Sequence, residues 1–254
     1  MSKRRINIYF SLIIVLVTNL SFCEELADTR IKDLVQSLSD KNVFAQQKSV
    51  EKLVRIGKDA VQYLISSLEN CNRDACANAV EALGLIGDES AINSILKILD
   101  RNRNIQGYEV LENQYIRVNS IKALGRLKAK DAIPVLEEIM QNERIIDKAW
   151  CQAALYQIDP KLTPLESLFG MAKNDDSKVR NVIVRFLSEQ RDPQVLPVLK
   201  ESLSDKEWYI RDNAVQGIGR LGNKKHIKWL KPLLEDPVPI VAETAKSAIE
   251  KLKK

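Results

Sequence analysis

The sequence is poor in the residues that build most catalytic and metal sites. It has one histidine, His226, and four cysteines among 254 residues. No second histidine is present to complete a metal site, and no cysteine pair has zinc-finger spacing. A phosphate-binding loop and a nucleophile elbow are also missing. We therefore expect no catalytic residues, no metal and no cofactor, and we predict that the chain is not an enzyme.

Glycine and proline are scarce as well, with nine and eight residues. This scarcity excludes a collagen-like chain and a disordered low-complexity chain. Hydrophobic residues make up 45% of the sequence, which is enough for a sizeable core. We find no alternating strand pattern of useful length, so the sequence predicts an all-α protein.

Most of the apparent positive charge lies at the N-terminus. Residues 1–23 contain three basic and no acidic residues, so the remaining 36 basic and 34 acidic residues give a net charge of only +2. Nucleic-acid binding draws its affinity from clustered phosphate contacts. A nearly neutral chain therefore argues against nucleic acid as the partner.

The first 23 residues have the pattern of a secretory signal. The basic cluster Lys3–Arg5 is followed by a mostly apolar run from Ile6 to Phe22. This run is short for a membrane span, which needs roughly 20 apolar residues. We expect export from a bacterial cytoplasm, to a periplasmic or a lipid-anchored location. Membrane contact is expected only through an N-terminal lipid or an uncleaved signal.

Two kinds of processing remain open at Cys23. The stretch Leu20–Cys23 resembles the bacterial lipoprotein box, in which the cysteine becomes lipidated, although Phe22 stands where that pattern has a small residue. The alternative is ordinary signal cleavage after Cys23. Two further cysteines, Cys71 and Cys76, flank a predicted turn, where they form either a disulfide or two reduced thiols.

Seven aliphatic residues mark an internal repeat. Their spacings are 30, 41, 31, 32, 31 and 31 residues. The residues three and four positions before each of them share a helical face with it, so one amphipathic helix recurs seven times. These anchor residues are Leu53, Leu83, Leu124, Leu155, Leu187, Ile218 and Ile249.

A second amphipathic helix precedes each of these helices. A pair of about 30 residues cannot bury both apolar faces alone, whereas stacked pairs can. Residues 24–254 therefore predict an α-solenoid, a superhelix of about seven stacked antiparallel helix pairs. Glycine four residues after an anchor is expected to end the helix in the left-handed conformation, at Gly57, Gly87 and Gly222.

The long 41-residue interval predicts an insertion at residues 101–114. Insertions in repeat arrays map to one face and often carry contacts, but a longer surface loop also costs little free energy. Both interpretations remain open, and Tyr108 is the residue that we would test first.

The repeat also resembles a known family. The triplets at Tyr115–Arg117, Lys178–Arg180 and Tyr209–Arg211, together with the segments AVEALGLIG and AVQGIGRLG, are similar to HEAT repeats. The resemblance covers residues 31–254 and is to the short type found in phycobilin lyases. It implies that Arg117, Arg180 and Arg211 form a ladder with acidic residues in the turns.

The resemblance further implies that the second helix of each pair lines a concave binding face. Helical-wheel positions then select the residues that point away from the core. Tryptophan among asparagine, tyrosine and arginine is typical of a protein-binding hot spot. In the alternative interpretation, Trp150 packs against the next unit and the arginines are a solvated face. The selected residues are Asn78, Tyr115, Asn119, Arg126, Trp150, Arg185, Tyr209, Asn213 and Arg220.

These observations predict an exported, non-catalytic scaffold or adaptor that binds a protein or peptide on its concave face. The family resemblance supplies an alternative, a bilin-lyase-like enzyme or chaperone. A second alternative is a nucleic-acid-binding protein, as some HEAT-like proteins are.

Overall fold

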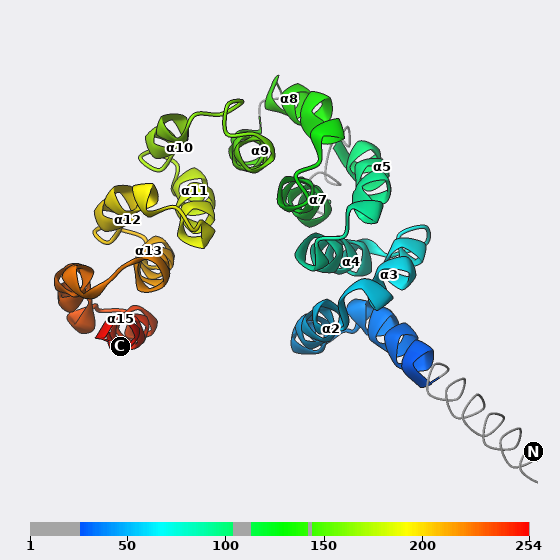
Figure 1. The fold of residues 1–254 in the computed structure, drawn as a ribbon, viewed down its shortest axis with the longest axis horizontal. Coiled ribbons are helices and arrows are strands. Elements are labelled where there is room, and N and C mark those ends of the chain that lie inside the picture. Colours follow the sequence, from blue (N-terminus) through cyan, green and yellow to red (C-terminus); the bar gives the residue numbers. More distant parts are fainter. Residues whose placement is uncertain (1–25, 104–112, 142–143, 254) are drawn as a thin grey trace, which may run out of the picture. The chain divides into compact units, whose positions relative to one another are not determined.

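The computed structural model describes residues 26–103, 113–141 and 144–253. Every regular element in these ranges is a helix, which confirms the predicted all-α fold (Figure 1). Among the described helices, none combines the length and the apolar character that crossing a bilayer requires. The predicted signal at residues 1–23 lies outside the described residues, and so does most of the predicted insertion, since α5 ends at Arg103 and α7 begins at Gln114.

The chain divides into two compact units, Met1–Ala123 and Leu124–Lys254. The boundary falls inside α7. In the first unit, residues 26–36 are helical. The other helices of the first unit are η1 (Ser37–Ser39), α2 (Val43–Ile56), η2 (Gly57–Ala60), α3 (Val61–Ser67), α4 (Arg73–Ile86), η3 (Glu89–Ala91), α5 (Ile92–Arg103) and most of α7 (Gln114–Arg126).

The second unit continues with alternating helices. In its C-terminal repeats, the first partner of each pair is short and partly 3₁₀. Its helices after α7 are η4 (Lys130–Ala132), α8 (Ile133–Gln141), α9 (Ile145–Ile158), α10 (Leu165–Met171), α11 (Ser177–Glu189), η5 (Pro193–Val195), α12 (Leu196–Ser202), α13 (Trp208–Leu221), η6 (Lys224–His226), α14 (Ile227–Leu230), η7 (Lys231–Glu235) and α15 (Pro239–Lys253).

The anchor residues are buried in the hydrophobic cores of both units. Leu53, Leu83, Leu124, Leu187 and Ile218 are fully buried, and Leu155 and Ile249 are 3% and 7% exposed. Each anchor lies on the second, or inner, helix of a pair, and the described residues contain seven such pairs. The predicted repeat and its helical phase are therefore confirmed, and the fold is an α-solenoid.

Within the second unit, the inner helices α9, α11, α13 and α15 pack in sequence, each against the next (Figure 1). Small residues allow this close packing. A Cβ atom added at Gly217 would lie 2.7 Å from Leu199 Cδ1 and 2.8 Å from Ser188 Cβ. Stacking of inner helices therefore holds the unit together, as expected for a repeat whose pairs cannot bury their faces alone.

The glycine prediction is confirmed at Gly87, which ends α4 in the left-handed conformation with φ of 79° and ψ of 24°. Gly57 ends α2 with a positive φ of 75°, but its ψ of −133° lies outside the left-handed helical region, so the predicted conformation is wrong there. Gly222 also ends its helix, and its N–H donates to Ile218 O at 2.8 Å, but its φ is −75° and its backbone is extended. The prediction of a left-handed cap at Gly222 is wrong, because the chain leaves α13 in an extended direction to begin η6.

Candidate functional site

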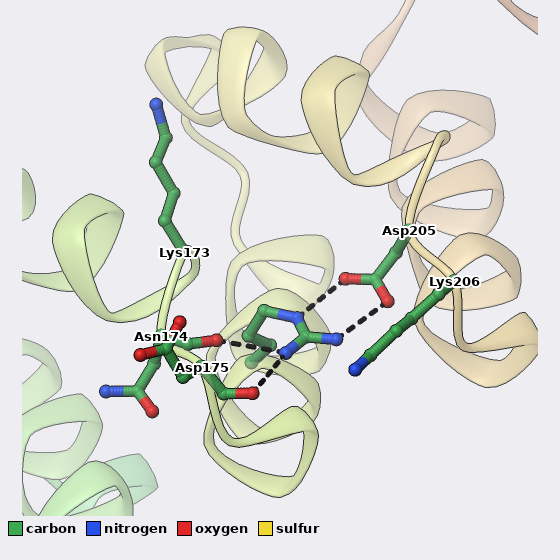
Figure 2. Close-up of a pocket in the computed structure, with 6 residues that line it drawn as sticks. Lys173, Asn174, Asp175, Asp205 and Lys206 are labelled. Carbon is green, nitrogen blue, oxygen red and sulfur yellow. Dashed lines mark hydrogen bonds and ion pairs between the residues drawn. The ribbon is translucent and has the colours of Figure 1, made fainter.

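The turns between repeats of the second unit hold two arginine–aspartate pairs. Arg180 donates from Nε to Asp205 Oδ2 at 2.7 Å and from Nη2 to Oδ1 at 3.0 Å. Its Nη1 donates to the backbone carbonyls of Asn174 and Asp175, as Figure 2 shows. Arg211 repeats the pattern with Asp236, with both side-chain bonds at 2.7 Å. These two rungs confirm the implied ladder.

The third expected rung lies in the first unit. Arg117 on α7 is 2% exposed, so its charged side chain is buried. Burial of a guanidinium is tolerated where its donors are occupied. The buried position fits the role that the family resemblance implies.

Electrostatics favour the ionised form of both ladder carboxylates. Burial alone would raise the pKa of Asp205, but the hydrogen bonds from Arg180 and from the Glu207 N–H outweigh it, so that pKa lies below its ordinary value. For Asp236 the hydrogen bond from Arg211 is the largest influence and lowers the pKa of the carboxyl. The pairs therefore stay charged over the whole neutral range.

A shallow hollow of about 380 Å³ surrounds the first ladder pair (Figure 2). The charged groups at its centre are already bonded to one another, and Lys173 at its rim pairs with Glu201 at 2.7 Å. A ligand would have to displace these bonds. The hollow is thus the place where Arg180 of one repeat bonds to Asp205 of the next. Its lining residues are Lys173, Asn174, Asp175, Arg180, Asp205 and Lys206.

A second group of charges gathers at the C-terminal ends of inner helices in the second unit. Arg126 Nη2 lies 3.5 Å from Glu189 Oε2, and Arg185 Nε lies 3.7 Å from Oε1 of the same carboxylate. Arg220 Nη2 donates to Ser188 Oγ at 3.4 Å. We call Arg126, Arg185, Glu189 and Arg220 the arginine cluster.

The arginine cluster has an excess of positive charge that an anion can use. It contains three guanidinium groups and one carboxylate, and the Arg185 side chain is 50% exposed. Its pair with Glu189 is long and therefore weak. Guanidinium groups bind carboxylates and phosphates through paired donors. This arrangement can hold an anionic group of a ligand at the ends of the inner helices.

Sequence reasoning selected the three arginines but missed Glu189. The signal was present, because Glu189 stands two residues after the anchor Leu187, the same position that Arg126 and Arg220 occupy after their own anchors. The predicted binding residues were aromatic, amide or basic, so Glu189 was left out, although its carboxylate pairs with Arg126 and Arg185.

The asparagines selected as binding residues bond to neighbouring repeats. Asn78 Nδ2 donates to Gln46 Oε1 on α2 at 3.1 Å and also to Leu38 O at 2.9 Å. Asn119 Nδ2 donates to Ala77 O on α4 at 3.0 Å. Asn213 Nδ2 donates to Asn181 Oδ1 at 3.0 Å. Their amide N–H groups therefore join successive inner helices.

The selected aromatic residues are placed differently from one another. Trp150 and Tyr209 are half-buried and pack against the core of the second unit. The Tyr209 hydroxyl lies 3.3 Å from Ser177 Oγ. Tyr115, in the first unit, is 72% exposed. The structure therefore does not bring Trp150 and Tyr209 together as a freely exposed surface.

Two buried acceptor atoms on the inner helices have no hydrogen-bond partner among the described residues. They are Asp212 Oδ1 on α13 and Gln152 Oε1 on α9. The other oxygen of Asp212, Oδ2, accepts from Gln216 Nε2 at 2.7 Å. A buried carboxylate oxygen without a donor is costly, so Asp212 can accept a hydrogen bond from a ligand.

The described cysteines and the histidine have structural roles. Cys71 and Cys76 form a disulfide whose Cα atoms are 5.2 Å apart. Cys151 is fully buried, and burial raises the pKa of its thiol, so it is a core residue. His226 Nδ1 accepts from Asn223 N at 2.9 Å and closes a capping box at η6.

Within the described ranges, no group of three or more His, Cys, Asp or Glu side chains is placed to hold a metal ion. Cys23 and Tyr108 lie outside the described residues.

Comparison with protein families finds HEAT repeats in both units. The HEAT repeat family matches residues 195–224, and the PBS lyase HEAT-like repeat matches residues 75–101 and 116–142. These matches confirm the resemblance to HEAT repeats of the phycobilin lyase type.

Curated relatives match over a shorter stretch. Deoxyhypusine hydroxylase of Rattus norvegicus is 33% identical over 82 residues, which is 32% of this chain and 27% of the relative. The same enzyme of Danio rerio is 31% identical over 81 residues. The chain thus spans about a quarter of the length of the curated relatives that it matches.

Solved structures with a similar fold include two enzymes. Human deoxyhypusine hydroxylase in complex with glycerol has a TM-score of 0.48 and 13% identity, with 92% of this chain and 99% of the other covered. The CpcE–CpcF complex of phycocyanin lyase from Nostoc sp. has a TM-score of 0.49 and 18% identity, with 86% and 93% covered.

The relatives contradict two predictions made from the sequence. A non-catalytic scaffold that binds a protein or peptide was expected, and the chain was predicted not to be an enzyme. Both predictions are wrong, since the curated relatives are named as an enzyme. The physical reason is that inner helices of a repeat present single residues from separate turns of the chain, so functional groups meet only in space and leave no contiguous motif.

Proposed function

Because this chain is built of HEAT repeats, two of them of the PBS lyase HEAT-like type, we propose that it is an enzyme or chaperone of the bilin-lyase kind. Its ligand in this proposal is a tetrapyrrole, and the arginine cluster of the second unit binds the carboxylates of that ligand. The observation that carries the proposal is the excess of guanidinium groups around Glu189.

Each residue of the arginine cluster has a distinct role in this proposal. Arg185 is the most exposed arginine of the two ion pairs and makes the weakest bond, so it turns from Glu189 to the ligand carboxylate at low cost. Arg126 is 22% exposed and stays close to Glu189, which fixes the direction of its guanidinium group. Arg220 is held by Ser188 and adds a third donor. Fixed donors lose less freedom on binding than flexible ones.

The test is a binding titration of the purified full-length protein with biliverdin, followed by absorption and fluorescence. We expect saturable binding with a changed absorption spectrum, and a loss of affinity of about tenfold or more in Arg185→Ala, since a charge-assisted hydrogen bond contributes about 1.5–3 kcal/mol. Lys97→Ala, an exposed cation on α5, is the matched control and should bind as the wild type does.

The outcome that opposes this proposal is equally clear. Equal biliverdin affinity in the wild type and in an Arg126→Ala/Arg185→Ala/Arg220→Ala variant would remove the arginine cluster from the function. Circular dichroism of the triple variant separates loss of binding from loss of fold.

The curated relatives favour a second candidate, hydroxylation of deoxyhypusine or of a similar amine-bearing side chain. Asp212 supports this candidate. Its buried Oδ1 has no hydrogen-bond donor among the described residues, and a substrate amine would supply one. Incubation with a deoxyhypusine-containing protein, dioxygen as the oxidant and a two-electron reductant, followed by mass spectrometry, tests this candidate. One oxygen atom of dioxygen enters the substrate C–H bond, and the other leaves as water. Gain of one oxygen atom that disappears in Asp212→Asn supports it, and an unchanged substrate mass rejects it.

A further inference from the structure

The last repeat carries a dense group of lysines on its outer side. No acidic residue occurs between Leu221 and Leu234. The lysines of this stretch are exposed, and so is Lys200 on the neighbouring α12. We call the group the lysine surface, and it consists of Lys200, Lys224, Lys225, Lys228 and Lys231.

The lysine surface follows one continuous helical run from η6 through α14 to η7. Lys224, Lys228 and Lys231 are spaced by four and then three residues, so they project near the same side of that run. The ion pairs found among the described residues include none of the five lysines. Within the part of the chain that the structure describes, no carboxylate therefore forms a close ion pair with these lysines.

A rigid aromatic frame holds the lysine surface in place. The Trp229 and His226 ring centroids are 4.4 Å apart. Lys200 Nζ lies 5.3 Å from the centre of the Trp229 ring. Trp229 also packs against the core of the second unit. The lysines are thus displayed on a fixed platform, which lowers the entropy cost of docking.

Like charges at helical spacing destabilise a helix. The chain as a whole is nearly neutral beyond residue 23, so four lysines in the last repeat, with Lys200 from the preceding one, are a local departure from its composition. Contact with an anionic partner would offset that repulsion.

The side chains favour a headgroup layer over a nucleic acid. The lysine surface contains no arginine, so it offers point charges instead of the paired donors that recognise single phosphates. His226 and Lys200 both lie against Trp229, which restricts stacking of a base on that ring. Leu234 follows in the same segment and is 44% exposed. Lysines beside an exposed leucine suit an anionic lipid surface.

We propose that the lysine surface docks the C-terminal repeat onto a layer of anionic phospholipid headgroups. This contact is independent of the arginine cluster and of the tetrapyrrole. It adds a second attachment to the membrane beyond any contact made by the N-terminal segment.

The test is amine-reactive labelling of the full-length protein, resolved by peptide mass spectrometry. The protein is incubated with phosphatidylcholine vesicles, or with vesicles that also contain phosphatidylglycerol. Phosphatidylglycerol should slow labelling of Lys225, Lys228 and Lys231 and leave Lys48 and Lys97 unchanged. The basic cluster Lys3–Arg5 also favours phosphatidylglycerol. The readout is therefore the slower labelling of Lys225, Lys228 and Lys231 relative to Lys48 and Lys97, and not overall binding to the vesicles.

Variants sharpen the result. Lys225→Gln/Lys228→Gln/Lys231→Gln should reduce the partition onto phosphatidylglycerol vesicles about 100-fold beyond any partition onto phosphatidylcholine. Lys48→Gln/Lys52→Gln/Lys97→Gln changes the net charge equally and should have little effect. Equal labelling on both vesicle types overturns the proposal, and so does protection of the same lysines by an oligonucleotide but not by phosphatidylglycerol.

Discussion

Arg180 reaches Asp205 across one repeat, with Nε 2.7 Å from one carboxylate oxygen and Nη2 3.0 Å from the other. The two residues are 25 positions apart, and Arg211 and Asp236 repeat that separation in the next repeat. In each pair the arginine lies on an inner helix and the aspartate in the turn of the following repeat. The ladder therefore couples the stability of neighbouring repeats in the second unit.

Removal of one ladder arginine should destabilise the second unit strongly. Asp236 is 3% exposed in its pair with Arg211, so Arg211→Ala leaves a buried carboxylate without its partner. Breaking a buried pair costs about 3 kcal/mol or more. Urea unfolding should show this loss, whereas Lys225→Ala, at an exposed lysine, should stay within about 0.5 kcal/mol of the wild type. Equal losses in the two variants would show that the pair does not stabilise the fold.

Acid should weaken the fold through the same pairs. The folded-state pKa values of Asp205 and Asp236 lie below their ordinary value of 3.8. Their contribution to stability is therefore complete above that value and is lost as the pH falls below it, towards the folded-state pKa values. Thermal unfolding measured from neutral pH downwards should show this loss. Asp236→Asn should begin less stable and should lose less on acidification, and an identical acid dependence would argue against the assignment.

The close packing of inner helices should make one glycine intolerant of a methyl group. Gly217→Ala would place Cβ within 2.9 Å of three atoms of Leu199 and Ser188, two of them at Ser188. Overpacking of this kind costs about 1–3 kcal/mol. Gly170→Ala is the matched control, since its Cβ meets no atom within 4 Å. The melting temperature should fall only in Gly217→Ala, and an equal change in both would mean that the helices readily move apart.

The cysteines should differ sharply in their reactivity. Cys71 and Cys76 are joined, and Cys151 is fully buried. Alkylation of the native protein should therefore modify none of the three. Reduction should make Cys71 reactive, whereas Cys76 is only 6% exposed and should react more slowly. Cys151 should react only after unfolding, because burial raises the pKa of its thiol. Peptide mapping resolves the sites. Alkylation of Cys151 in the native state would contradict its place in the core.

The disulfide should contribute modestly to stability. Its two cysteines are separated by five positions, and a loop of that size gives about 2 kcal/mol in the chain-entropy model. Cys71→Ser/Cys76→Ser should lower the urea midpoint accordingly without changing the helical content. A variant as stable as the wild type under oxidising conditions would mean that the bridge adds no constraint.

The sequence by itself determined the repeat, the helical phase and the buried anchors. Leu53 and Leu187 could be placed in the core from spacing alone, because an apolar residue that recurs on one face of a helix must be covered by the next helix. The ladder residues Arg180 and Arg211 were also found, on the strength of the family resemblance.

Only the tertiary structure decided which polar side chains bond to a neighbouring helix and which remain available to a ligand. Helical-wheel angles place Asn78 and Asn213 away from their own core, but they do not show that the neighbouring inner helix lies within hydrogen-bond distance of each. The pairing of Arg126 and Arg185 with Glu189 likewise needs three residues from two helices. Periodicity is a property of one helix, whereas a site on stacked repeats is made by distances between helices, and those distances are set only when the repeats pack.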